Sequence, residues 1–144
     1  MSDREPGQLA AYPKVLVGAE VADLLGLDPR NVAAAAAAGK LPAFKVHPHG
    51  EWRFDRRRIA AVIENRATGS FPPLLEGFPD VMSPRQVGEV LRYEARTVQQ
   101  MAAAGTMPGG FKVGGPQARW RFSRAVLSKV IEQQPAPAAE PPPE

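Results

Sequence analysis

The 144-residue chain contains no cysteine, which excludes disulfide bonds and thiolate metal sites. Its only two histidines, His47 and His49, flank one proline with no third ligand nearby, so a metal site is not expected. No run of eighteen apolar residues occurs, and the N-terminus lacks the apolar stretch of a secretory signal, so neither a membrane span nor a signal peptide is expected. No catalytic constellation and no phosphate-cradling loop is recognisable, so we predict no enzymatic activity and no cofactor.

Charge of one sign is not in large excess, because the formal net charge is only +3. Its distribution is more informative than its sum. Residues 14–65 carry +2 and residues 79–132 carry +4, whereas both ends of the chain are slightly acidic. The positive charge therefore lies in the two segments that we expect to fold.

The chain repeats itself at a distance of 66 to 68 residues. Residues 21–39 read VADLLGLDPRNVAAAAAAG and align without a gap with residues 87–105, which read VGEVLRYEARTVQQMAAAG. Further on, GEWRFDRRRIAAVIE corresponds to ARWRFSRAVLSKVIE. Self-similarity at a fixed distance predicts a duplicated domain.

Each copy predicts a helix, a short turn and a second helix, then a two-stranded wing and a last helix. Helix starts are indicated by Ser83 before Pro84 and by Asp28 before Pro29. Gly39 and Gly105 suit the left-handed conformation that ends a helix. The expected wing strands are residues 44–46 with 52–54, and 111–113 with 120–122. Asp55 and Ser123 are the expected caps of the last helices.

The predicted fold class is mainly α with small β wings, in two tandem winged helix-turn-helix domains. The boundaries that we predict are 1–13 for a disordered N-terminal arm, 14–65 for the first domain, 66–79 for a linker, 80–132 for the second domain and 133–144 for a disordered tail rich in Pro, Ala and Glu.

Short motifs at matching places carry a family resemblance. The first copy contains Val21-Ala22, Gly39-Lys40-Leu41-Pro42, Lys45-Val46 and Trp52-Arg53-Phe54. The second contains Val87-Gly88, Gly105-Thr106-Met107-Pro108, Lys112-Val113 and Trp120-Arg121-Phe122. Over about 50 residues per copy, this pattern resembles the excisionase and MerR-like winged helix-turn-helix DNA-binding family.

The resemblance implies that the second helix of each copy enters the major groove of DNA and that the wing lies along phosphates. Arg, Gln, Asn and Thr side chains are suited to base edges, and Lys and Arg to phosphates. The expected base contacts are Arg96, Thr97, Gln99, Gln100, Arg30 and Asn31. The expected phosphate and wing contacts are Lys112, Arg119, Arg121, Arg124, Lys45, Arg53 and Arg56.

The first copy departs from the pattern in its second helix, where Arg30 and Asn31 are followed by Val32 and six alanines. Two interpretations stay open. An alanine surface could approach the groove and touch thymine methyl groups, or it could contact another protein or the other domain, and the second interpretation is slightly favoured. Under the second interpretation, the chain is a protein-interaction adaptor with weak or no DNA binding.

Other conspicuous residues have structural explanations. We expect Trp52 and Trp120 to anchor the core of each copy and not to stack on DNA bases. The run Arg56-Arg57-Arg58 follows a helix cap, where positive charge opposes the helix dipole, so a solvated face and a DNA contact are equally favoured. His47 and His49 could also form a pH-sensitive phosphate contact.

The function expected from the resemblance is sequence-specific binding of double-stranded DNA, as a transcriptional regulator or an excisionase-like recombination directionality factor. The second copy is expected to be the main base reader. A recombinase, RNA polymerase or another protein is a possible partner of the first copy, and no membrane partner is expected. The expected location is cytoplasmic and nucleoid-associated, in a bacterial or phage-encoded protein.

Overall fold

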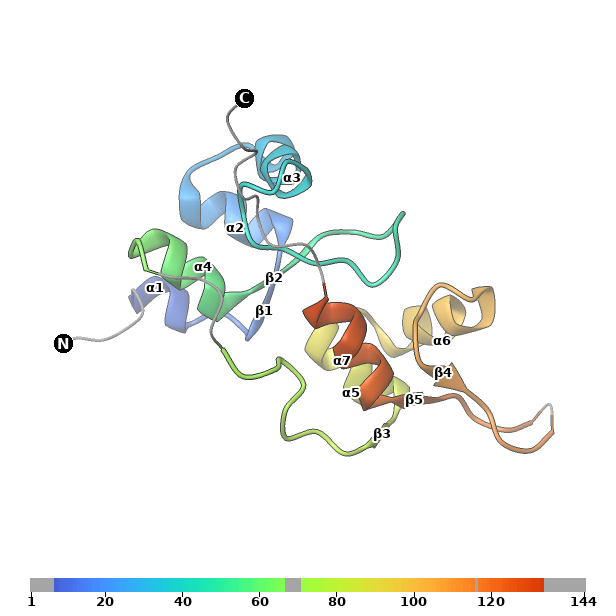
Figure 1. The fold of residues 1–144 in the computed structure, drawn as a ribbon. Coiled ribbons are helices and arrows are strands. Elements are labelled where there is room, and N and C mark those ends of the chain that lie inside the picture. Colours follow the sequence, from blue (N-terminus) through green and yellow to red (C-terminus); the bar gives the residue numbers. More distant parts are fainter. Residues whose placement is uncertain (1–6, 67–70, 116, 134–144) are drawn as a thin grey trace, which may run out of the picture. The chain divides into compact units, whose positions relative to one another are not determined.

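The computed structural model describes residues 7–66, 71–115 and 117–133 (Figure 1). These residues fall into two compact units. The first comprises the described residues up to Phe44 and from Trp52 to Phe71, and the second comprises residues 45–51 and the described residues from Pro72 to Gln133. No helix in the described part of the chain is both long and apolar enough to cross a membrane.

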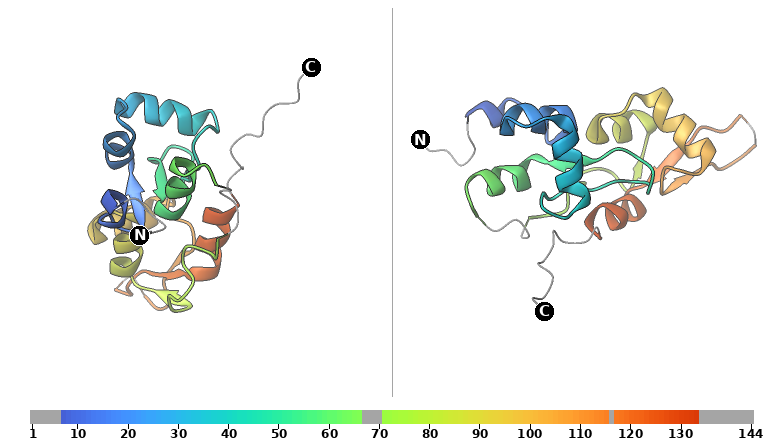
Figure 2. Two further views of the ribbon diagram at one scale, coloured as in Figure 1. Left: turned by 90° about the vertical axis from the view of Figure 1, so that its left-hand side faces the viewer. Right: turned by 90° about the horizontal axis from the view of Figure 1, so that it is seen from above.

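The first repeat consists of short helices and one small sheet. Its elements are α1 (Gly7–Ala10), β1 (Val15–Val17), α2 (Gly18–Leu25), α3 (Pro29–Ala37), β2 (Arg53–Asp55) and α4 (Arg56–Ile63). Strands β1 and β2 are antiparallel, with Leu16 opposite Phe54. Helices α2 and α3 form a pair joined by a short turn, which is visible in both views of Figure 2.

The second repeat has the same order of elements after its first turn. Its elements are β3 (Val81–Met82), α5 (Pro84–Leu91), α6 (Ala95–Ala104), β4 (Gly110–Phe111), β5 (Arg121–Ser123) and α7 (Arg124–Glu132). The antiparallel sheet has the order β3-β5-β4. The expectation of a mainly helical fold with small β elements is therefore confirmed.

The strands differ in detail from the prediction, which lacked β1 and β3. In the first repeat, the predicted strand at 44–46 is reduced to one bridge between Phe44 and Arg53. The loop that follows bonds to itself instead of to a neighbouring strand: Gly50 N–H donates to the His47 carbonyl at 2.8 Å, and His49 N–H donates to His47 Nδ1 at 3.1 Å. These local bonds replace a ladder.

Apolar side chains at equivalent positions of the repeat form the core of each unit. In the first, the buried cluster consists of Leu9, Leu16, Val21, Ala22, Val32, Ala36, Leu41, Phe54, Ile59 and Ala60. In the second, the corresponding buried residues include Leu75, Met82, Val87, Leu91, Val98, Ala102, Met107, Phe122, Leu127 and Ile131. Phe54 and Phe122, the middle residues of β2 and β5, are fully buried.

Residues 7–13 are part of the fold, which corrects the disordered arm predicted for 1–13. Leu9 in α1 is fully buried. Burying a leucine side chain stabilises a fold by about 1.5–3 kcal/mol, which favours an ordered segment here. Residues 1–6, and the predicted disordered tail from residue 134 onward, lie outside the described residues.

The segment 66–79 was predicted as a linker that packs partly on a domain, and its second half repeats the segment before β1. Tyr12 N–H donates to the Leu9 carbonyl at 3.0 Å, and Phe78 N–H donates to the Leu75 carbonyl at 3.1 Å. Leu75 is 1% exposed. The repeated unit therefore begins before the first strand, and residues 74–79 belong to the second unit.

Candidate nucleic-acid interface

The turn between the paired helices is similar in the two repeats. Gly26 ends α2 with a φ of 68°, and Arg92 ends α5 with a φ of 67°, so both are left-handed. In each turn, the N–H of the next residue bonds back to the first helix: Leu27 to the Ala22 carbonyl and Tyr93 to the Gly88 carbonyl, both at 2.9 Å. This bond closes the helix and directs the chain into the second helix.

The second helices also end alike. Gly39 and Gly105 have φ values of 77° and 80°, which confirms the left-handed conformation expected of both. Lys40 N–H donates to the Ala35 carbonyl and Thr106 N–H to the Met101 carbonyl, both at 2.8 Å. Helices α3 and α6 therefore have matching C-terminal ends.

Helix α6 presents a polar face to solvent. Val98 and Ala102 are buried on its inner side. Arg96, Gln99 and Gln100 are exposed, and Thr97 is half-buried. The four residues expected to read bases thus lie in the first half of one helix, and three of them are exposed.

Helix α3 has the same inner side, formed by Val32 and Ala36. Arg30 and Asn31 are exposed in its first turn, and the exposed positions that follow carry only methyl groups, at Ala33, Ala34, Ala37 and Ala38. Arg30 is at the position equivalent to Arg96, whereas Ala33 and Ala34 replace Gln99 and Gln100. The structure therefore places one exposed arginine at this position of each repeat, and exposed glutamines in the second repeat alone.

The wing of the second repeat carries accessible positive charge. Lys112 and Arg119 are both exposed, on the two sides of the loop that joins β4 to β5. The Lys112 ammonium lies 5.0 Å from the centre of the Trp120 ring. This cation–π contact positions the lysine across the base of the wing while its charge stays accessible to a phosphate.

In the first repeat, Lys45 is half-buried and its Nζ donates to the Pro48 carbonyl at 3.2 Å. The rings of His47 and His49 are 5.6 Å apart in the same loop. No group of three or more His, Asp or Glu side chains that could hold a metal ion is found in residues 7–66, 71–115 and 117–133.

Arg53 and Arg121 occupy equivalent strand positions and bond to the residue before them. Nη1 of Arg53 donates to the Trp52 carbonyl at 3.2 Å, and Nη1 of Arg121 donates to the Trp120 carbonyl at 2.7 Å. Arg53 is only 5% exposed, so little of it is accessible to a phosphate. Trp52 packs against the core of the first unit, as expected of an anchor.

Arg56 and Arg124 begin the last helix of each repeat and hold the segment before the first strand. The guanidinium of Arg56 donates to the carbonyls of Ala10 and Tyr12. That of Arg124 donates to the Phe78 carbonyl at 2.8 Å and pairs with Asp80 at 3.0 Å. Internal bonds therefore occupy Arg56 and Arg124, two of the arginines that the sequence predicts as phosphate contacts, and their geometry indicates a structural role.

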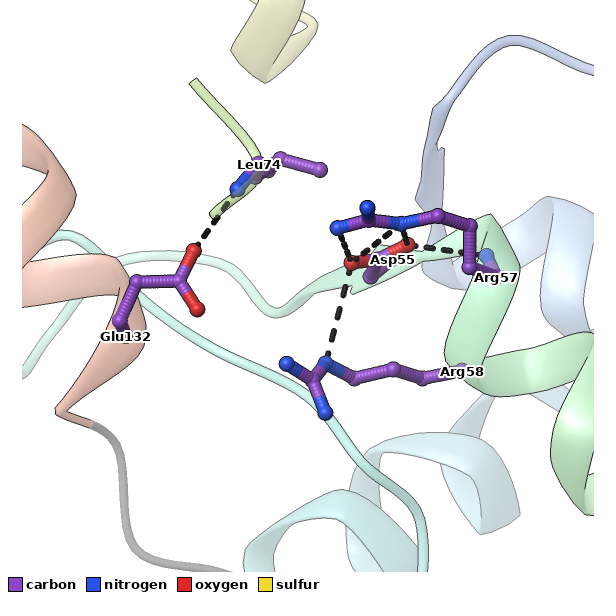
Figure 3. A network of polar contacts seen from close by, with 5 residues as sticks. All are labelled: Asp55, Arg57, Arg58, Leu74 and Glu132. Atoms are coloured by element: carbon purple, nitrogen blue, oxygen red, sulfur yellow. Dashed lines mark hydrogen bonds and ion pairs between the residues drawn. The ribbon is translucent and has the colours of Figure 1, made fainter. Parts of the chain in front are cut away.

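Figure 3 shows why a run of arginines is tolerated at the start of α4. The buried Asp55 carboxylate accepts from the Arg57 N–H at 2.9 Å and pairs with the Arg57 and Arg58 guanidiniums at 2.7 and 3.7 Å. The same guanidiniums lie 5.2 and 5.3 Å from the centre of the Phe71 ring. The carboxylate compensates the charge that opposes the helix dipole, so these arginines stabilise the first unit.

The second unit has its own long-range polar contact, also drawn in Figure 3. The Glu132 carboxylate, at the end of α7, accepts a hydrogen bond from the backbone N–H of Leu74 at 2.9 Å. This bond joins the first turn of the unit to its last helix. Ser123 caps α7 by accepting from Val126 N–H at 3.2 Å, so the caps predicted at Asp55 and Ser123 are both confirmed.

Lys40 was not among the predicted contacts, although its motif carried the resemblance. It is exposed and directly follows the end of α3. A lysine after the second helix is absent from the second repeat, which has Thr106 there. The difference between Lys40 and Thr106 is visible in the sequence and could have indicated an additional exposed cation in the first copy. Comparing only the features that the two motifs share leaves it unnoticed.

Comparison with known proteins identifies a protein family that matches the first repeat. A helix-turn-helix domain family model matches residues 18–67. No curated protein and no solved structure matches the chain. The matched segment starts at the first residue of α2 and includes α3, the wing loop and α4. Its family suggests DNA binding, and we conclude that residues 18–67 are a helix-turn-helix domain.

Proposed function

We propose that this protein binds double-stranded DNA in a sequence-specific manner through two tandem winged helix-turn-helix domains, with the second as the main base reader. The observation that carries the proposal is the face of α6, where Arg96, Gln99 and Gln100 are exposed opposite buried Val98 and Ala102. Arginine can bond guanine at two points, and glutamine can do so with adenine. The domain match in the first repeat, and the equivalent elements of the second, support both domains.

The exposed cations add the electrostatic part of binding. Lys112 and Arg119 flank the second wing, and Lys40 follows α3. Such residues position a protein on DNA without reading its sequence. A regulator of transcription and an excisionase-like factor that directs a recombinase are both compatible with these exposed charges. Neither use requires catalysis by the chain, and we propose that it has none.

The test is in vitro selection from random duplex DNA with the full chain. A variant with Arg96, Thr97, Gln99 and Gln100 all replaced by alanine is run in parallel, because alanine preserves helix propensity. The control is Lys129→Ala, which also removes one positive charge but lies on α7 and belongs to neither α6 nor the wing. We expect a motif with the intact chain and the control, and its loss with the quadruple variant. A motif unchanged in the quadruple variant contradicts the assignment of α6.

A second candidate function is an adaptor that binds another protein through the first domain. The observation that favours it is the exposed face of α3, which presents four alanine methyl groups after Asn31. Hydroxyl-radical footprinting on a selected duplex distinguishes the candidates. Protection of two segments supports DNA binding by both domains, and protection of one segment that disappears in the quadruple variant supports the adaptor.

A further inference from the structure

We propose that the DNA site has two half-sites that share a guanine at equivalent positions, read by Arg30 and Arg96, and that only the second half-site is specified further. This inference rests on the proposed function and names the target of its interface. The two arginines are 66 residues apart and lie at the same position of the repeat, two residues after the N-cap of α3 and of α6. Both are exposed.

The surroundings of Arg30 suit a base contact. Its side chain is 91% exposed, and its Nε donates to Oδ1 of Asp28 at 3.4 Å. The bond uses Nε, so Nη1 and Nη2 remain for the two acceptors of guanine, O6 and N7. A carboxylate beside the guanidinium also restricts its rotamers, which lowers the entropy lost on binding.

Asp28 has a second task that limits how it can be tested. The same Oδ1 accepts from the backbone N–H of Arg30 at 2.8 Å and so caps α3. Asparagine caps helices about as well as aspartate but carries no charge. Asp28→Asn therefore separates the positioning of the arginine from the stability of the helix. In the second repeat the N-cap is Glu94, whose side chain makes no capping bond.

The next turn of each helix makes the half-sites unequal. The exposed glutamines at 99 and 100 offer bidentate contacts to adenine, and the equivalent Ala33 and Ala34 offer only methyl groups. The first half-site is then short and centred on one guanine, and the second is longer. The alanine face is compatible with DNA binding because small side chains allow a helix to approach the groove closely.

The experiment repeats the selection with full-length Arg30→Ala, Arg96→Ala and Asp28→Asn. We expect Arg30→Ala to erase the guanine of the short half-site alone and Arg96→Ala that of the long half-site alone. On the best duplex, each arginine variant should bind about tenfold or more weakly. When the guanine assigned to the substituted arginine is also replaced in the duplex, the variant and the intact chain should bind that duplex equally well. Asp28→Asn should reduce the preference for the first guanine with no change in helical content by circular dichroism.

Two results would overturn the inference. One is a motif with a single half-site that depends on Arg96 alone, which leaves DNA binding by the second domain intact. The other is an equal loss of affinity for all duplexes in Arg30→Ala, which assigns that arginine to phosphates. Failure of the proposed function has a different signature, because no variant and no intact chain then selects any motif.

Discussion

Asp55 and Ser123 are equivalent residues with unequal tasks. Each accepts from a backbone N–H at the start of the following helix, but Asp55 also pairs with two arginines. Its side chain is 6% exposed, and those of Arg57 and Arg58 are 20% and 23% exposed. Removing one partner of a pair with so little solvent around it leaves charges uncompensated.

We therefore expect Asp55→Ala to lower the free energy of unfolding by about 3 kcal/mol, more than the loss of a cap alone. Ser123→Ala is the matched control, because it removes only a cap, and should cost about 1 kcal/mol. Urea unfolding followed by circular dichroism measures both. Equal effects of the two substitutions would show that the ion pairs of Asp55 contribute nothing.

The roles of several arginines could not be predicted from the sequence because their partners are distant along the chain. The cap at Asp55 was predictable from its position before an apolar helix, but the pairing of its carboxylate with the arginine run was not. Arg56 reaches a carbonyl 44 residues away, and Arg124 one 46 residues away. No local pattern encodes such bonds. The exposed residues of α3 and α6 could be predicted from the sequence. Val32 and Ala36, and likewise Val98 and Ala102, are four residues apart and mark the buried side of each helix, so the residues on the other side face solvent.

The turn between α5 and α6 in the second repeat lies closer to its first helix than the equivalent turn between α2 and α3. A Cβ atom on Gly88 would lie 2.4 Å from the carbonyl oxygen of Tyr93, a distance that real Cβ atoms do not adopt. The equivalent residue in the first repeat is Ala22, which is 3% exposed and accommodates its methyl group. The pairs therefore differ in how closely the turn approaches the first helix.

We predict that Gly88→Ala destabilises the chain by about 1–3 kcal/mol, because the turn after α5 must move to admit the methyl group. The helix propensity of alanine favours the substitution by about 1 kcal/mol, so a net loss would show that the contact dominates. Thermal unfolding of the variant measures the balance, with Gly18→Ala as a control whose Cβ meets nothing within 4 Å. Stabilisation by Gly88→Ala would contradict the packing described here.

The element boundaries show where sequence patterns were sufficient. Caps and left-handed glycines located the helices, whereas the short strands β1 and β3 have no periodicity of their own and exist because β2 and β5 pair with them. The three residues of β1 are too few to show alternation. The turns that precede β1 and β3 could not be predicted from a local pattern either, because each is ordered by one buried leucine, Leu9 or Leu75, that packs against residues far along the chain.

At the scale of the whole molecule, a net charge of +3 is small, so DNA binding should depend on a few well-placed cations. Lys40, Lys112 and Arg119 are the exposed cations of the proposed interface besides the two arginines that we propose to contact bases. If each neutralises one phosphate, the logarithm of the affinity should fall against the logarithm of salt concentration with a slope of about −3.

Lys112→Ala should make that slope shallower by about 0.9 and weaken binding to all sequences alike. Fluorescence anisotropy at several salt concentrations measures the slope, and Lys129→Ala provides a control of equal charge on α7. An unchanged slope for Lys112→Ala would remove the second wing from the interface.

The bond between Leu74 and Glu132 has a consequence for how such a chain could arise. It brings together two residues 58 positions apart, close to the beginning and the end of the second unit. A unit whose ends meet can be copied in series or inserted into another gene without stretching the polypeptide on either side. Each copy of such a unit can also change independently of the other, and in this chain α6 carries glutamines at positions where α3 carries alanines.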